Sequence, residues 1–258
     1  MNTPSHVVVF DNDGTFTPKG PGNAISLVNT VDNNAGLPET AKKELQALRD
    51  EYMAPVLNGA LSHRDQREWM HGTLGIYHRH GLDLNRARGA VSRLSIRPGV
   101  KECLILLRDA GIPRAIVSFG VADFIEAYLA THGIAGMVDS VYAARLRFFD
   151  GIGCYGSPEN MAKTGICDGY DPDSIIVPAN KGEASRHFAD LYRVPHDRIL
   201  AVGDSGGDKY LGHAKENRLL IASDDKEAAK ISAFAGTVVV TDDFAPVTQW
   251  LKSKLGLT

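Results

Sequence analysis

Short apolar runs alternate with amphipathic helical stripes over most of this 258-residue chain, and this alternation constrains the fold more than any other feature. The first run, Val-Val-Val-Phe at residues 7–10, is continuously apolar, as expected for a parallel strand buried on both faces. Further elements are expected as helices at 100–107, 121–129 and 180–192 and as strands at 112–117, 199–202, 219–222 and 238–240. Strands that alternate with helices predict an α/β fold, a doubly wound, mostly parallel, Rossmann-like sheet covered on both faces.

Two kinds of local signal refine this expectation. Asn180 and Glu183 have the spacing of a capping box at the head of a helix, and Asp224 with Glu227 opens another capped helix. Residues 145–155 predict a hairpin around Asp150-Gly151, a favoured tight-turn pair.

Residues 17–95 interrupt the alternation, because they hold no convincing strand. Residues 37–48 and 66–80 are expected to be helical and carry many charges. We therefore expect a core domain made of residues 1–16 and 96–258, and a mostly helical insertion at residues 17–95, called the insertion below.

Composition excludes several classes of function. A formal charge of −3 gives no electrostatic basis for binding a nucleic acid polymer or an anionic membrane surface. No apolar stretch is long enough to span a bilayer, and the N-terminal sequence does not resemble a signal peptide. The three cysteines show no C-x-x-C spacing, which fits a reducing compartment, so a cytoplasmic protein is expected.

Two acids follow the first strand, in the sequence Asp11-Asn12-Asp13-Gly14-Thr15. Side chains two positions apart at a strand end point the same way, so one acid can attack phosphorus while the other handles the leaving-group proton. Gly14 allows the backbone to turn sharply and approach a phosphate. An Asx-rich turn without a catalytic role is the alternative.

Ser118 ends a predicted strand and is followed by Phe119-Gly120. A hydroxyl with free backbone N–H groups at a helix start suits a phosphate oxygen, although a simple helix cap is the better explanation of Ser118 by itself. Lys181 stands at the start of another helix, where the helix dipole disfavours a cation. An anion in the crevice would account for this lysine, and an ordinary surface position is the alternative.

The sequence Gly203-Asp204-Ser205-Gly206-Gly207-Asp208 directly follows a further strand. Carboxylate oxygens are the ligands that Mg²⁺ prefers, and it usually takes one or two from a protein. Ligands of open α/β sheets bind at the carboxyl ends of the strands, so all four motifs are expected to face one crevice.

In this order the four motifs resemble the haloacid dehalogenase (HAD) superfamily of phosphohydrolases, whose pattern is D-x-D-G-T, a Ser or Thr, a Lys, and G-D-x-x-x-D. The resemblance spans the chain except for the insertion, whose place directly after the first motif matches a C1-type cap. The layout is nearest to the phosphoserine phosphatase and pyrimidine nucleotidase branches.

The resemblance implies a Mg²⁺-dependent phosphatase that acts on a small phosphorylated metabolite. Asp11 would be the nucleophile that becomes phosphorylated, and Asp13 would protonate the leaving alkoxide and then deprotonate water. Asp11, the Asp13 backbone carbonyl and Asp204 would bind Mg²⁺, and Asp208 would support either the metal or Lys181. The phosphate-binding residues would be Asp13, Gly14, Thr15, Ser118, Phe119, Gly120 and Lys181.

Some of these motifs also occur in other classes of protein. Gly203–Gly207 reads Gly-Asp-Ser-Gly-Gly, as around the nucleophile of trypsin-like proteases, but the cysteines are scarce and the setting is α/β. Residues 151–156 match G-x-G-x-x-G without the helix that a dinucleotide fold requires. A phosphotransferase or mutase using the same intermediate and a receiver-like phospho-acceptor module that does not turn over remain alternatives.

Substrate identity is expected to depend on the insertion, where Arg64 and Arg67 are candidates for reading the organic part of the substrate. A solvated helix face is the alternative for each of them. Phosphoserine phosphatases carry a Glu soon after the first motif, and residues 16–22 contain no acid, which argues against phosphoserine.

Overall fold

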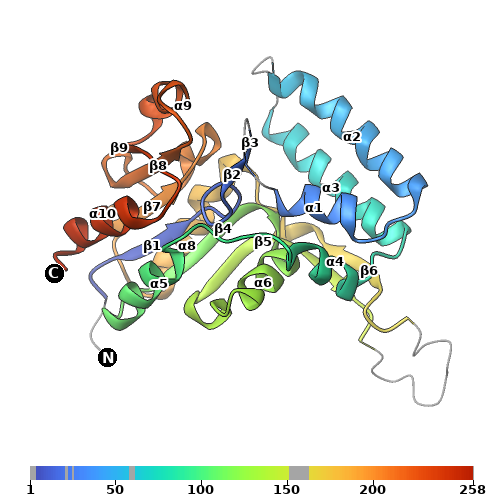
Figure 1. The fold of residues 1–258 in the computed structure, drawn as a ribbon, viewed down its shortest axis with the longest axis horizontal. Coiled ribbons are helices and arrows are strands. Elements are labelled where there is room, and N and C mark those ends of the chain that lie inside the picture. Colours follow the sequence, from blue (N-terminus) through green and yellow to red (C-terminus); the bar gives the residue numbers. More distant parts are fainter. Residues whose placement is uncertain (1–3, 21–22, 25, 58–61, 151–162, 258) are drawn as a thin grey trace.

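The computed structural model describes residues 4–20, 23–24, 26–57, 62–150 and 163–257. The described residues form a seven-stranded sheet with the strand order β6-β5-β4-β1-β7-β8-β9 (Figure 1). Its strands are β1 (Val7–Phe10), β4 (Arg114–Val121), β5 (Ser140–Phe148), β6 (Cys167–Asp171), β7 (Ile199–Gly203), β8 (Arg218–Ala222) and β9 (Thr237–Val240). Among the described strands of this sheet, only β5 and β6 are antiparallel neighbours. The expected α/β class, a doubly wound and mostly parallel sheet, is confirmed.

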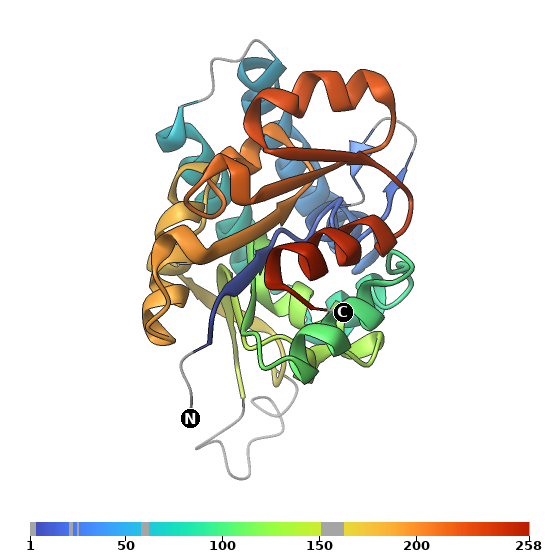
Figure 2. The ribbon, with the colours of Figure 1, turned by 90° about the vertical axis from the view of Figure 1, so that its left-hand side faces the viewer.

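Helices cover both faces of the sheet, and the alternation of side chains along β1 shows how. Val7 and Val9 pack with α8 (Lys181–Leu191) on one face. Val8 and Phe10 belong to the larger core on the other face, which contains side chains of α5 (Val100–Asp109), α6 (Ala122–Thr131) and α10 (Ala245–Leu255). Figures 1 and 2 both show α10 beside α5 on this second face. Helix α9 (Asp225–Ile231) packs on β8 and β9.

The pairing of β1 brings the motifs to one edge of the sheet. This strand pairs in parallel with β4 on one side and with β7 on the other. The register extends to the strand ends, where Phe10 faces Val202 and the Asp11 amide donates to the Val202 carbonyl oxygen at 2.8 Å. The residues that follow β1 and β7 therefore emerge side by side.

The insertion is mostly helical, as expected, with elements that the sequence did not reveal. Its helices are α1 (Leu27–Asn34), α2 (Glu39–Leu57), α3 (His63–Arg79) and α4 (Leu84–Val91), and a short antiparallel pair, β2 (Lys19–Gly20) and β3 (Asn23–Ala24), precedes them. Helices α2 and α3 pack against each other (Figure 1). The expected helices at 37–48 and 66–80 correspond to α2 and α3, whereas α1 and α4 were missed. The domain boundaries after residues 16 and 95 stay a prediction.

Hydrogen bonds from core residues hold the two connections between core and insertion close to each other. The Tyr128 hydroxyl donates to the Ser95 carbonyl oxygen at 2.9 Å and lies 3.4 Å from that of Phe16. Arg97, only 1% exposed, donates from Nε to the Thr15 carbonyl oxygen at 3.0 Å. These bonds provide hydrogen-bond partners for backbone oxygens of both connections.

Two local predictions were wrong. Strand β4 continues to Val121, beyond the expected end at residue 117, and α6 begins at Ala122. The capping box at Asn180 does not form, because the Asn180 side chain instead accepts from the Val177 amide at 2.6 Å. Asp224 does cap α9, with its carboxylate accepting from the Glu227 amide at 2.7 Å.

The chain does reverse after β5, but its antiparallel partner is β6, further along the chain than expected. The predicted turn at Asp150-Gly151 and the glycine motif at 151–156 run into residues outside the described part of the chain. Among the described helices, none has the length and apolar character needed to cross a membrane.

Candidate active site

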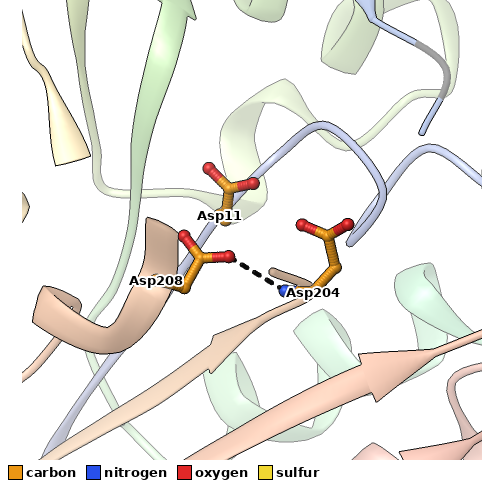
Figure 3. Close-up of side chains that lie close together, drawn as sticks. All are labelled: Asp11, Asp204 and Asp208. Carbon is orange, nitrogen blue, oxygen red and sulfur yellow. Dashed lines mark hydrogen bonds between the residues drawn. The ribbon is translucent and has the colours of Figure 1, made fainter. Parts of the chain in front are cut away.

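Three acids from two neighbouring strand ends converge at the carboxyl edge of the sheet. Asp11 follows β1, and Asp204 and Asp208 follow β7 (Figure 3). One carboxylate oxygen from each lies within 4.8 Å of the others, and all three side chains are buried. Buried acids at this spacing repel one another, so the cluster requires positive charge.

Lys181 at the start of α8 supplies one such charge. Its Nζ lies 2.8 Å from Asp11 Oδ1 and 2.6 Å from Asp208 Oδ1, and the residue is 4% exposed. Burial works to lower the pKa of this ammonium, but the two carboxylates outweigh it and raise the pKa above its ordinary value. Lys181 is therefore charged and bridges the first and last motifs.

Asp208 has both oxygens engaged by the protein. While Oδ1 accepts from Lys181, Oδ2 accepts from the amides of Asp204 at 3.0 Å and Ser205 at 3.1 Å. Burial opposes its ionisation, yet Lys181 and these amides lower its pKa below the usual range. A Cβ at Gly203 would lie 2.6 Å from the Asp208 side chain, so only glycine leaves room for this arrangement.

In Asp11 and Asp204, unlike Asp208, the protein environment disfavours the ionised carboxylate. Burial, with repulsion from Asp208 and Asp204, raises the pKa of Asp11 well above its usual range, although Lys181 opposes the shift. Burial and Asp208 raise the pKa of Asp204 to about 7, although Lys19 opposes the shift. A divalent cation would stabilise both ionised forms, because it would be the largest charge in the site. The donor set, hard oxygens with uncompensated negative charge, fits Mg²⁺.

Asp13 faces the insertion and lies outside the three-acid cluster. Burial raises the pKa of its carboxyl, and hydrogen bonds from Asn12, Ser26 and the Leu27 amide partly oppose the shift. Asn12 Nδ2 donates to Asp13 Oδ1 at 2.8 Å. A carboxyl with a raised pKa at the edge of a cavity suits a general acid and base.

Ser118, Phe119 and Gly120 lie within β4, where the register is irregular. Val117 pairs with Tyr142 and Val121 with Ala144, so four steps on β4 oppose two on β5. Such bulges disrupt the ladder and re-aim side chains, often next to active sites. The buried Ser118 and the Phe119 ring both line the cavity described below.

Gly14 and Thr15 form the turn after Asp13 and do not line that cavity. Gly14 has a φ of +79°, which favours glycine, and its amide donates to Thr17 Oγ1 at 2.8 Å. The buried Thr15 hydroxyl has no hydrogen-bond partner among the described residues. Their direct contact with phosphate stays a prediction.

A cavity of about 340 Å³ lies between the core and the insertion, directly above these acids. Its core side is formed by Asp11, Asp13, Ser118, Phe119, Pro178, Lys181, Asp204, Ser205 and Gly207. Its insertion side is formed by Ser26, Val28, Asn29, Asp32, Leu45, Arg49, Trp69, Met70 and Thr73. Lys181 and the acid pair of the first motif therefore face one space, together with Ser118 and Asp204.

The aromatic part of the insertion side is organised around Trp69. Its ring stacks on Tyr52, with centroids 6.2 Å apart and an interplanar angle of 3°, and meets Phe119 edge-on at 6.1 Å. Phe119 follows Ser118 in the core, so this contact joins the two sides of the cavity. A flat apolar wall of this kind suits a planar or apolar group.

The polar part of the insertion side is a network centred on the buried Asp32. Arg49 Nη2 donates to Asp32 Oδ2 at 2.9 Å and to Asn29 Oδ1 at 2.8 Å, and the Tyr77 hydroxyl donates to Asp32 Oδ1 at 2.6 Å. Burial raises the pKa of Asp32, opposed by Tyr77 and Arg49.

Arg64 and Arg67, the candidates for reading the substrate, do not line the cavity. Arg64 is paired with Glu68 on the solvent face of α3, with its side chain 86% exposed. Arg67 donates to the Pro172 carbonyl oxygen. Helix α3 turns Trp69, Met70 and Thr73 inward instead. The helical periodicity of α3 is a signal that could have separated these two faces, whereas Arg49 carries no such signal.

A family model of haloacid dehalogenase-like hydrolases matches residues 6–214. The match covers most of the chain, including every motif named above. The chain belongs to the haloacid dehalogenase-like hydrolases and is an enzyme.

Solved structures share its fold across nearly its full length. Cytosolic 5'-nucleotidase IIIB bound to cytidine is 22% identical with a TM-score of 0.74, covering 98% of this chain and 85% of that one. A phospho-aspartyl intermediate analogue of phosphoserine phosphatase is 17% identical with a TM-score of 0.61, covering 95% and 98%. A substrate-bound phosphoserine phosphatase is 17% identical with a TM-score of 0.62, covering 96% and 99%. At these identities the likeness establishes a common fold.

Proposed function

We propose that this protein is a Mg²⁺-dependent phosphatase that hydrolyses a small phosphate monoester through an aspartyl-phosphate on Asp11. The observation that carries the proposal is the position of Asp11, which is buried at the floor of a cavity between Lys181 and two further acids. Phosphoryl transfer requires positioning and charge neutralisation above all, and this site provides both. The family, and the phosphatase and nucleotidase structures with the same fold, agree with it.

In the first step a carboxylate oxygen of Asp11 attacks phosphorus, and the bond from phosphorus to the ester oxygen breaks. Lys181 holds the other Asp11 oxygen and neutralises charge on the transferring group. Asp13, in its protonated form, which burial favours by raising the pKa of the carboxyl, gives its proton to the departing alkoxide.

In the second step Asp13, now ionised, takes a proton from water, which attacks phosphorus and releases inorganic phosphate from Asp11. Mg²⁺, held by Asp11, Asp204 and the Asp13 backbone carbonyl, would reduce the repulsion between the carboxylate and the phosphate dianion. Ser118 would donate to a phosphoryl oxygen. Asp208, whose oxygens are already engaged, would keep Lys181 in place and would not bind the metal directly.

The organic part of the substrate would lie against the insertion side of the cavity, with Trp69 as an apolar wall and Arg49 as a cation on that side. Arg49 is already paired with Asp32, which favours a neutral, hydrogen-bonding group over a second full negative charge. We infer a cytoplasmic location from the free, buried thiols of Cys103 and Cys167.

The test is phosphate release from an aryl phosphate such as p-nitrophenyl phosphate. We expect Mg²⁺-dependent turnover that falls at least about 10⁴-fold in Asp11→Asn, because the nucleophile is lost. Asp225→Asn, at an exposed position on α9, is the matched control and should keep full activity. Undiminished turnover in Asp11→Asn, or in the presence of a chelator, would refute the mechanism.

A further inference from the structure

Lys19, in the short strand β2, places a buried ammonium beside the acid that follows β7. Its Nζ lies 3.0 Å from Asp204 Oδ2 and 2.8 Å from the Asp204 backbone oxygen. It also lies 3.2 Å from the Ile221 carbonyl oxygen and 2.7 Å from Glu227 Oε1. The side chain is 6% exposed. An ammonium has three N–H donors, and here four oxygens surround it, so the group is fully coordinated by the protein.

The partner on the far side of Lys19 is also fixed. Glu227 Oε2 accepts from the Ser223 amide at 2.7 Å and from the Ser223 hydroxyl at 2.8 Å. Lys19 therefore joins Asp204 to a carboxylate that is anchored at the start of α9. This arrangement differs from an exposed ion pair, in which two mobile side chains gain little from each other.

Asp204 depends on this contact. Across the described ranges of the chain, Lys19 makes the only ion pair or hydrogen bond to the Asp204 carboxylate. By contrast, Asp208 is held by Lys181 and by two amides. Without Lys19, nothing described would hold the Asp204 carboxylate in its position next to Asp11.

We propose that Lys19 is a positioning residue that orients the Asp204 carboxylate for the divalent cation and ties residues 17–20 of the insertion to that site. The proposal rests on the proposed function, because it assumes that Asp204 binds the cation. It extends the site beyond the four motifs to Lys19 and Glu227.

A positioning role and a purely electrostatic role of Lys19 predict opposite effects of its removal on Mg²⁺ affinity, which makes the proposal testable. The positive charge of Lys19 by itself disfavours a second cation nearby, so a role limited to charge means that its removal tightens Mg²⁺ binding. A residue that orients a metal ligand has the opposite effect, because its loss typically weakens metal binding about 10- to 100-fold.

The decisive protein is the double variant Lys19→Met with Glu227→Gln, which removes one positive and one negative charge and so leaves the net charge of the site unchanged. We expect its dissociation constant for Mg²⁺, measured by isothermal titration calorimetry on the metal-free full chain, to rise at least about tenfold. Raising Mg²⁺ should then restore kcat toward the wild-type value. The matched control is Lys42→Met with Glu39→Gln, which removes the exposed pair at 2.8 Å on α2 and should leave Mg²⁺ binding unchanged.

Mg²⁺ binding as tight as wild type, or tighter, in the double variant would overturn the proposal. Absence of Mg²⁺ binding in the wild type would instead overturn the proposed function, and Asp204→Asn gives the reference for a lost site. Circular dichroism checks that each variant is folded. If the double variant does not fold, Lys19→Met alone decides, because weaker binding supports positioning, whereas unchanged or tighter binding contradicts it.

Discussion

The two sides of the cavity are built on different principles. On the core side, Asp11 and Lys181 are buried and are fixed by specific ion pairs with each other and, for Lys181, with Asp208. On the insertion side, an apolar part contains Trp69, which is placed by ring contacts with Tyr52 and Phe119.

This difference teaches where chemistry and selectivity reside. A buried charge needs particular partners at particular distances, so few residue types can replace it. An apolar wall needs shape and volume, which many combinations of residues provide. We therefore expect changes on the core side to alter kcat for every substrate, and changes on the insertion side to alter KM in a substrate-dependent way.

The largest effect after loss of the nucleophile should come from Lys181→Met. We expect kcat for aryl phosphate hydrolysis to fall about 10³-fold, because the cation that holds Asp11 and the phosphoryl group is lost. Lys209→Met, at an exposed lysine next to Asp208, is the control. A fall of less than about tenfold would contradict the contrast drawn between the two sides.

The second prediction concerns the stability of the metal-free protein as a function of pH. The pKa of Asp204 rises from its unfolded value of 3.8 to about 7 on folding, so the folded state binds the extra proton. The stability contribution of this group is therefore fully present below about pH 4 and is lost as pH rises through 7.

Asp204→Asn removes this loss, because the amide stays neutral. By urea unfolding of the metal-free protein, the variant should be more stable than wild type at pH 8 by on the order of 2–4 kcal/mol, with the difference shrinking toward pH 4. Mg²⁺ should stabilise the wild type and not the variant. An equal response of both proteins to Mg²⁺ would exclude Asp204 as a metal ligand.

On the insertion side, Trp69→Leu should raise KM about 10- to 30-fold for an aromatic phosphomonoester while changing kcat little, because a stacking surface of about 1.5–2 kcal/mol is lost. A small aliphatic phosphomonoester should be affected less. Arg67→Met, on the same helix but outside the cavity, is the control. A fall in kcat for both substrates would show that the two sides do not act separately.

The smallest expected effect is structural. Tyr77→Phe removes the buried hydrogen bond of 2.6 Å to Asp32 while Arg49 remains, so the free energy of unfolding should fall by about 1–2 kcal/mol. Tyr192→Phe, at a partly exposed ring, should change it by less than about 0.5 kcal/mol. Equal stability of both variants would mean that the Asp32 network contributes nothing measurable.

The core was predictable from sequence because its signals are local. The apolar run at 7–10 and the acids that follow it define a strand and its end, and parallel pairing then brings Asp11 next to Asp204. The extent of β4 was not predictable, because its irregular register with β5 depends on tertiary packing across Ser118. The capping box expected at Asn180 failed for a local reason, because the Asn180 side chain accepts from the Val177 amide in the turn before α8.

The insertion was less predictable. Lys19 stands in a segment of proline and glycine that carries no periodicity, and its partners Asp204 and Glu227 lie about 200 positions away. Arg49 lies on a helix with many charged residues, and the sequence does not distinguish it from the others. Its ion pair with Asp32 becomes visible only in the packing of that helix. Long-range ion pairs of this kind produce no local pattern in the sequence from which they could be predicted.

The hydrogen bonds that hold together the two connections between core and insertion have a consequence for how such enzymes diversify. Tyr128 and Arg97 bind the segment that enters the insertion and the segment that leaves it. The distance between these two segments is therefore fixed by residues of the core. A different module with closely spaced termini could be exchanged beyond residue 20 without disturbing the acids on the sheet, provided that Lys19 stays beside Asp204. Substrate selectivity can thus change while the catalytic residues of the core stay the same, because the core itself fixes the junction with the insertion.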